Sequence, residues 1–121
     1  MGSIEDNKTL VRRLWDGLVS DNQNAIIEHL PPNYVFHLPG GQEIRGPEGM
    51  KQIVFGFLPA FPDFRITIDD IIAEEDKVVW RSTRTATHKG EWLGAQATGK
   101  QVTWTYITIS RIEDGRIVEE W

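Results

Sequence analysis

Two adjacent carboxylates near the end of the chain are the side chains whose type and spacing best suit proton transfer. Glu119 and Glu120 lie in a predicted strand, 116–121, that follows Asp114-Gly115. This dipeptide supplies the positive φ that a two-residue hairpin turn needs. Successive side chains of a strand point to opposite faces, so the two carboxylates face opposite ways. Apolar surroundings would raise a carboxyl pKa towards neutrality and suit it to shuttle a proton.

The alternative for this pair is a solvated strand end without chemistry. Such carboxylates pair with arginines across the sheet for little net stability. The arginines available for this are Arg45, Arg81, Arg84 and Arg111. Both interpretations stay open for Glu120, whereas the solvated one is favoured for Glu119.

The histidines offer one further acid–base candidate and no metal site. His29, His37 and His88 show no metal-ligand spacing, so we predict no metal. His37 ends a short predicted strand, 34–37, and titrates in the range useful for acid–base work at a pocket mouth. It fits equally well as a polar strand-end residue. His88 is expected to hold a loop in place. The sequence contains no serine-nucleophile motif and no phosphate-binding glycine motif, so no cofactor is expected.

Aromatic residues gather on shared faces, where they form a core more often than a ligand site. Trp104 and Tyr106 share one face of a predicted strand, 101–112, with Thr108. If the fold encloses a pocket, as the family resemblance given below implies, we expect this face to line it. Trp15 and Phe36 would then form the opposite wall, and Tyr106 and Thr108 would donate to a developing oxyanion. Trp80 shares its strand face with Arg84, and such a face is as typical of a dimer interface as of a core.

Hydrophobic periodicity predicts the elements that position these side chains. Apolar residues recur at helical spacing over 4–19, 23–30 and a segment from 46 to Pro59, and strand patterns follow from residue 64. The alternation slips at 69–72, which predicts a bulge that curves the sheet. The order of elements indicates an α+β domain with a mainly antiparallel sheet. The residues expected to be buried include Val11, Leu14, Ile53, Val54 and Ile66.

Composition narrows the class of partner. The chain has 121 residues, a formal net charge of −5 and no cysteine. We therefore expect one domain over 1–121, no nucleic-acid partner, and a reducing, cytoplasmic setting. No apolar run approaches the length of a membrane span, so no membrane partner is expected.

Several segments together resemble the SnoaL-like polyketide cyclases, within the ketosteroid-isomerase-like or nuclear-transport-factor-like cone fold. The resemblance covers nearly the whole chain and rests on segments that include Pro32-Asn-Tyr-Val-Phe-His37, Arg45-Gly-Pro-Glu-Gly49, Phe61-Pro-Asp-Phe64, Thr87-His-Lys-Gly-Glu-Trp-Leu-Gly94 and Arg111-Ile-Glu-Asp-Gly-Arg-Ile117. It implies three N-terminal helices packed on a curved sheet that encloses a pocket. It also implies that Glu120 looks into that pocket.

The resemblance leaves two functions open. The first is a cofactor-free cyclase, isomerase or hydrolase that acts on a small apolar carbonyl or cyclic molecule. Its expected catalytic residues are Glu120, Tyr106 and His37, and Trp15, Phe36, Trp104 and Thr108 would bind the substrate. The second is a non-catalytic binding or dimerising protein. The enzyme is the leading interpretation. One departure from the family pattern supports the second function: the cyclases carry their acid–base aspartate directly after the position of Trp121, where this sequence has no residue. The cyclases also carry a histidine at the position of Thr108. A homodimer that packs sheet to sheet is expected in either case.

Overall fold

A capped amphipathic helix packs its apolar side against the sheet. The computed structural model describes residues 3–16 and 23–121. Helix α1 (Ile4–Trp15) begins at Ser3, whose Oγ accepts from the Asp6 N–H at 3.0 Å while the Asp6 carboxylate accepts from the Ser3 N–H. This reciprocal capping satisfies two N–H groups that the first turn leaves free. Its buried residues include Val11, Leu14 and Trp15, as predicted. The predicted extension over 17–19, with Leu18, lies outside the described residues.

Two more helices and six strands complete the described fold. The helices are α2 (Gln23–His29) and α3 (Gly46–Phe57), and the strands are β1 (Val35–His37), β2 (Glu43–Arg45), β3 (Arg65–Glu74), β4 (Lys77–Thr87), β5 (Gln101–Glu113) and β6 (Arg116–Glu120). The sheet order is β2-β1-β6-β5-β4-β3. All neighbouring strands are antiparallel except β1 and β6, which pair in parallel. The fold is α+β, as expected.

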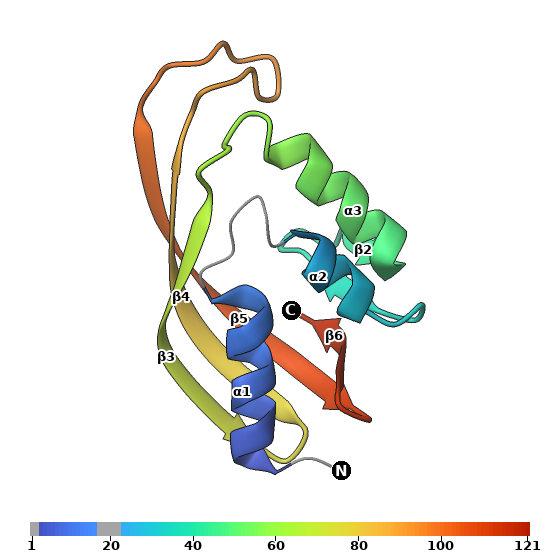
Figure 1. Cartoon of the computed structure of the whole chain (residues 1–121). Helices are drawn as coiled ribbons and strands as arrows, with labels where there is room; N and C mark the ends of the chain where they lie inside the picture. The colour runs from blue at the N-terminus through green and yellow to red at the C-terminus, as the bar shows by residue number, and fades with distance from the viewer. Residues whose placement is uncertain (1–2, 17–22) are drawn as a thin grey trace.

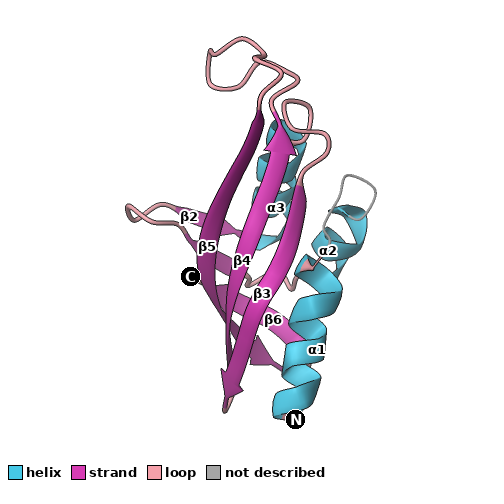
Figure 2. Ribbon diagram, turned by 90° about the vertical axis from the view of Figure 1, so that its left-hand side faces the viewer, coloured by secondary structure: helices cyan, strands magenta, loops and turns pink. Residues whose placement is uncertain are grey.

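The sheet curves around the helices. The three helices lie on the concave side of the long strands β3, β4 and β5 (Figure 1). The view from the side shows β2 and β6 crossing behind these strands (Figure 2), and β1 lies between them in the sheet. The register shifts between Ile68 and Asp70, which confirms the predicted bulge. A bulge increases local bending, and here it lets the sheet wrap over α1.

Two expectations about side chains and one about strands need correction. Ile53 was expected in the core but is 49% exposed, because its side of α3 faces a cavity instead of packed side chains. The face of β4 that carries Trp80 is not an outer dimerisation face. Trp80 is 1% exposed and stacks on Trp15 with ring centroids 6.3 Å apart. Strand β2 was not expected. It pairs with β1 across the Pro39-Gly40-Gly41 turn.

Candidate functional site

A cavity of about 220 Å³ lies between the helices and the concave face of the sheet. Its wall draws on α1, β1, α3 and the long strands, and apart from Arg84 and Tyr106 the lining residues are apolar or tryptophan. They are Trp15, Phe36, Leu38, Ile44, Met50, Ile53, Val54, Phe57, Leu58, Phe64, Ile66, Trp80, Arg84, Trp104 and Tyr106. Small-molecule sites have this composition, with apolar walls and a few polar groups that orient the ligand.

Four of the residues expected in the site line this cavity. Trp15 enters from the end of α1 and Phe36 from β1, while Trp104 and Tyr106 come from the inward face of β5. Trp104 stacks on Phe64 with ring centroids 5.8 Å apart. The aromatic rings therefore hold one another in place around the cavity.

Arg84 carries the one formal charge among the described residues that line the cavity. It was not among the expected site residues. Its guanidinium carbon lies 4.6 Å from the centre of the Tyr106 ring and 5.8 Å from that of Trp80. Its Nε donates to Ser82 Oγ at 3.3 Å. Burial lowers the pKa of Arg84 from its usual value, yet an arginine remains charged at neutral pH. The site thus presents a positive charge and a phenol to an otherwise apolar space.

Glu120 is fully buried behind the cavity wall, at the centre of a hydrogen-bond network. Its Oε1 accepts from Tyr34 Oη at 2.7 Å, and its Oε2 accepts from Trp15 Nε1 at 3.2 Å and from Ser110 Oγ at 2.5 Å. Trp80 Nε1 donates to Ser110 Oγ at 2.9 Å, so the serine proton is directed to the carboxylate. Glu120 does not line the cavity, but Trp15 and Trp80 do.

Two opposing effects set the protonation of Glu120. Burial penalises its charged form and raises the pKa of the Glu120 carboxyl to about 7. The hydrogen bonds from Ser110, Tyr34 and Trp15, and then the charge of Arg84, act in the lowering direction. Burial also raises the pKa of the Tyr34 phenol, with the charge of Glu120 as the next cause. A carboxyl with a pKa near 7 can take up and release a proton at physiological pH.

Thr108 lies beside this network and not in the cavity wall. It is fully buried on the inward face of β5, and its Oγ1 has no hydrogen-bond partner among the described residues. Because it stands between Tyr106 and Ser110 on that face, it adds a further hydroxyl at the deep end of the site.

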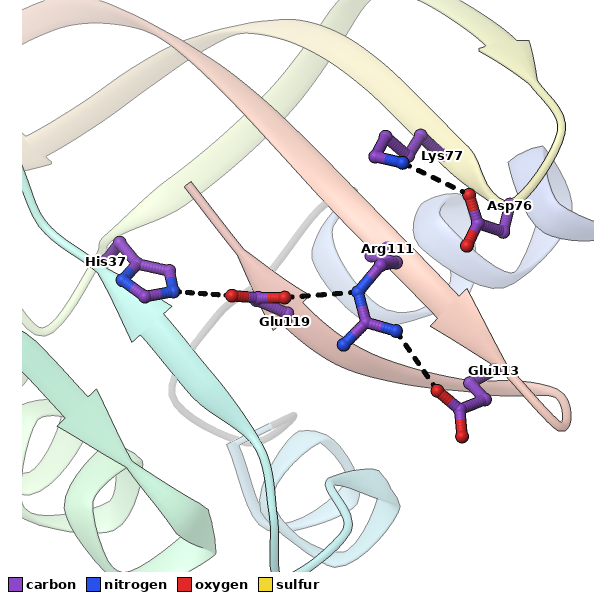
Figure 3. A network of polar contacts seen from close by, with 6 residues as sticks. All are labelled: His37, Asp76, Lys77, Arg111, Glu113 and Glu119. Atoms are coloured by element: carbon purple, nitrogen blue, oxygen red, sulfur yellow. Dashed lines mark hydrogen bonds and ion pairs between the residues drawn. The ribbon is translucent and has the colours of Figure 1, made fainter.

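His37 faces away from the cavity. Its Nε2 lies 2.7 Å from Glu119 Oε2 and its Nδ1 lies 3.2 Å from Glu43 Oε2. Figure 3 shows the chain of contacts that continues from Glu119 to Arg111 and on to Glu113. The hydrogen bond to His37, followed by that to Arg111, lowers the pKa of the Glu119 carboxyl. The ring of His37 also stacks on Trp121. The structure therefore separates His37 from Glu120, although His37 and Tyr106 both line a second, open pocket on the outside of the sheet.

The described residues, 3–16 and 23–121, form neither a metal-ligand cluster nor a membrane-spanning helix. No group of three or more histidine, aspartate or glutamate side chains in those ranges could hold a metal ion. No helix there is long and apolar enough to cross a membrane.

Comparison with known proteins places this chain in a family. The sequence model described as SnoaL-like polyketide cyclase matches residues 8–121. The chain belongs to the SnoaL-like polyketide cyclase family. A comparison with curated proteins finds no match.

Solved structures of similar fold agree with this family assignment. The "putative hydroxylase" AclR of Streptomyces galilaeus is 34% identical, with a TM-score of 0.82 over 98% of this chain and 88% of that one. The "putative polyketide cyclase" IdmH of Streptomyces antibioticus is 29% identical, with a TM-score of 0.79 over 99% and 90%. A "putative SnoaL-like polyketide cyclase" of Jannaschia sp. CCS1, 22% identical with a TM-score of 0.85 over 99% and 86%, shares the fold.

Sequence reasoning missed the residues that surround the expected ones in this SnoaL-like site. Tyr34 and Ser110 hold Glu120, and Arg84 supplies the charge of the cavity. A signal for Arg84 existed, because it shares a strand face with Trp80. For Tyr34 and Ser110 only the tertiary contacts reveal the role.

Proposed function

We propose that this SnoaL-like protein is a cofactor-independent enzyme that binds a small, mostly apolar carbonyl compound in the cavity and removes a proton next to the carbonyl group. The observation that carries the proposal is an apolar cavity whose wall includes Arg84 and Tyr106, two groups able to donate to a carbonyl oxygen. A carboxyl with a raised pKa, Glu120, lies directly behind the same wall.

The proposed step follows from what each group can do. The C–H bond beside the carbonyl breaks, its electron pair moves into the carbonyl group, and negative charge develops on the oxygen. Donors fixed where that charge develops stabilise it by a few kcal/mol, and Arg84 and Tyr106 are such donors. Glu120 takes the proton, and its pKa of about 7 suits this exchange near neutral pH. An aldol-type ring closure begins from the same enolate.

The step requires a movement of Trp15. Its indole lines the cavity and at the same time donates to Glu120 Oε2. A ligand that displaces this ring would open a path from the cavity to the carboxyl.

The volume of the cavity limits the size of the ligand. An apolar cavity of about 150 Å³ holds benzene, so the cavity of about 220 Å³ suits a molecule of one or two rings.

A second function, binding without chemistry, is supported by the same carboxyl. Both oxygens of Glu120 are engaged by three donors, and Trp15 stands between them and the cavity. In that case Glu120 holds the core together, and the cavity stores or carries its ligand.

Hydrogen–deuterium exchange separates the two functions. We would incubate 2-tetralone, a two-ring ketone with an acidic C–H bond, in deuterated buffer and follow loss of its α-proton by NMR. The enzyme should accelerate exchange, and Glu120→Gln should abolish the acceleration while calorimetry still detects binding. Glu113→Gln, an exposed change on β5, is the matched control and should behave as the unaltered protein.

Each contrary result has a defined meaning. Binding of the ketone without faster exchange supports the binding protein and refutes the enzyme. Full exchange in Glu120→Gln removes Glu120 from the mechanism. Exchange that is then lost in His37→Gln would move the chemistry to the outer face of the sheet.

A further inference from the structure

Arg84 is a partly buried charge that no counter-ion contacts directly among the described residues. No carboxylate of the described residues forms an ion pair with it, and its Nη atoms make no hydrogen bond there. Several other arginines pair with neighbouring carboxylates, and these are Arg12, Arg45, Arg81 and Arg111. Removing a guanidinium from water is unfavourable unless a partner compensates it.

The surrounding rings hold the guanidinium but do not neutralise it. Tyr106 and Trp80 offer their faces at 4.6 and 5.8 Å, and Ser82 Oγ accepts from Nε. Cation–π contacts of this kind stabilise and orient a cation. Glu120 acts on Arg84 through its charge, but both of its carboxylate oxygens already accept hydrogen bonds, from Tyr34, Trp15 and Ser110. The planar fork of Nη donors therefore stays available at the cavity wall.

A planar fork of donors matches a particular chemical group. Arginine binds delocalised oxyanions with two parallel N–H···O bonds, and such charge-assisted bonds are stronger than neutral ones. The rest of the cavity wall is apolar and aromatic, so it suits the rings of the same ligand. One ligand can satisfy both parts of the wall only if it combines rings with an anionic oxygen group.

We propose that the cavity selects ring-containing apolar molecules that carry one delocalised oxyanion, and that Arg84 is the residue that recognises this group. The oxyanion is either a carboxylate or the anion of an acidic enol or phenol. This inference rests on the proposed function, because it requires the cavity to bind an apolar ligand. It goes further in naming the charge of the substrate class.

Calorimetric titration with matched two-ring probes tests the inference. At pH 7 we would compare 2-naphthoate with its neutral counterpart 2-naphthamide, and add 2-naphthol as a third probe. The unaltered protein should bind the acid about ten-fold or more tightly than the amide, in the range expected of a charge-assisted contact. Arg84→Gln should bind both with similar affinity, because it should lose more affinity for the acid than for the amide.

Two further variants control for charge and folding. Arg81→Gln removes the same charge from the opposite face of β4 and should keep the full preference for the acid. Arg84→Lys keeps the charge but loses the fork, so it should retain only part of the preference. If circular dichroism shows that Arg84→Gln does not fold, the unaltered protein and Arg84→Lys still decide the question.

The possible outcomes separate this inference from the proposed function. Binding of the amide with no preference for the acid overturns the inference alone, as does a preference that survives in Arg84→Gln. Binding of neither probe overturns the proposed function and the inference together. The naphtholate absorption of bound 2-naphthol at pH 7 would extend the recognised group to enol-type anions, and its absence would confine that group to carboxylates. Both results support recognition of an oxyanion when the acid is preferred.

Discussion

The protonation of Glu120 makes the stability of the protein depend on pH in a direction that can be tested. The pKa of this buried carboxyl is raised from 4.5 to about 7 in the folded chain. A folded-state pKa above the unfolded value means that the folded protein holds the proton more tightly. The stabilising contribution is thus fully present below pH 4.5 and is lost as the pH rises through 7.

The size of the effect follows from the shift. At about 1.4 kcal/mol per pKa unit, the full loss across this window is about 3 kcal/mol, of which about 2–3 kcal/mol falls between pH 5 and pH 8. Glu120→Gln keeps the shape and the neutral state of the protonated acid. The amide can accept from Trp15 and Ser110 and can donate to the oxygen of Tyr34. The variant should therefore resemble the unaltered protein at pH 5 and lack the loss at higher pH.

Urea unfolding followed by tryptophan fluorescence measures this difference. The free energy of unfolding of Glu120→Gln minus that of the unaltered protein should rise by about 2–3 kcal/mol from pH 5 to pH 8. Taking the difference removes the pH-dependent contributions of the other titrating groups, because these groups are the same in both proteins. Glu119→Gln, on the same strand but facing outward, should show no such rise, because the pKa of Glu119 is lowered instead.

A difference that stays flat from pH 5 to pH 8 would refute the reasoning. It would mean that the three donors around Glu120 match or outweigh burial, so that the folded-state pKa lies at or below the unfolded value of 4.5 and the carboxyl titrates below this pH range.

Two further predictions concern assembly and the backbone. We propose that the protein forms a homodimer through the outer face of the sheet. On this face Ile72, Val79 and Ile109 lie in one row across β3, β4 and β5, and the Trp121 backbone pairs with that of Ile109 at the edge of the row. The side chains of Ile72 and Ile107 are 63% and 64% exposed. Ile107→Lys should then shift sedimentation from dimer to monomer while the loop change Leu93→Lys does not, and a monomeric unaltered protein would contradict the proposal. Gly46 has a φ of +69°, and a Cβ there would lie 3.3 Å from the Pro32 carbonyl oxygen, so Gly46→Ala should lower the free energy of unfolding by about 1–2 kcal/mol. Gly56→Ala, within α3 and free of close contacts, should instead raise it by about 0.5–1 kcal/mol, and equal effects of the two changes would count against the strain at Gly46.

Local chemistry in the sequence was enough to place most elements. The Asp114-Gly115 turn has φ values of 52° and 74°, as the dipeptide predicts, because few residue types accept that backbone conformation. The stripe of Val11, Leu14 and Trp15 and the bulge after Ile68 were also predicted, since both follow from the side-chain period of a single segment. Strand β2 was missed because its three residues, Glu43, Ile44 and Arg45, include a single apolar side chain, whereas β1, of the same length, is apolar and aromatic up to His37.

Only the tertiary structure decided which face of each element is covered and which distant groups meet. Periodicity shows that Trp80 and Arg84 share a face, but it does not reveal that α1 covers this face and turns it towards the cavity. The same limit applies to Ile53, whose stripe meets a cavity and not a packed core. Glu120 meets Trp15 and Tyr34, which lie 105 and 86 positions away along the chain. Contacts over such separations arise from the packing of whole elements, and the raised pKa of Glu120 depends on them because burial is a property of the assembled fold.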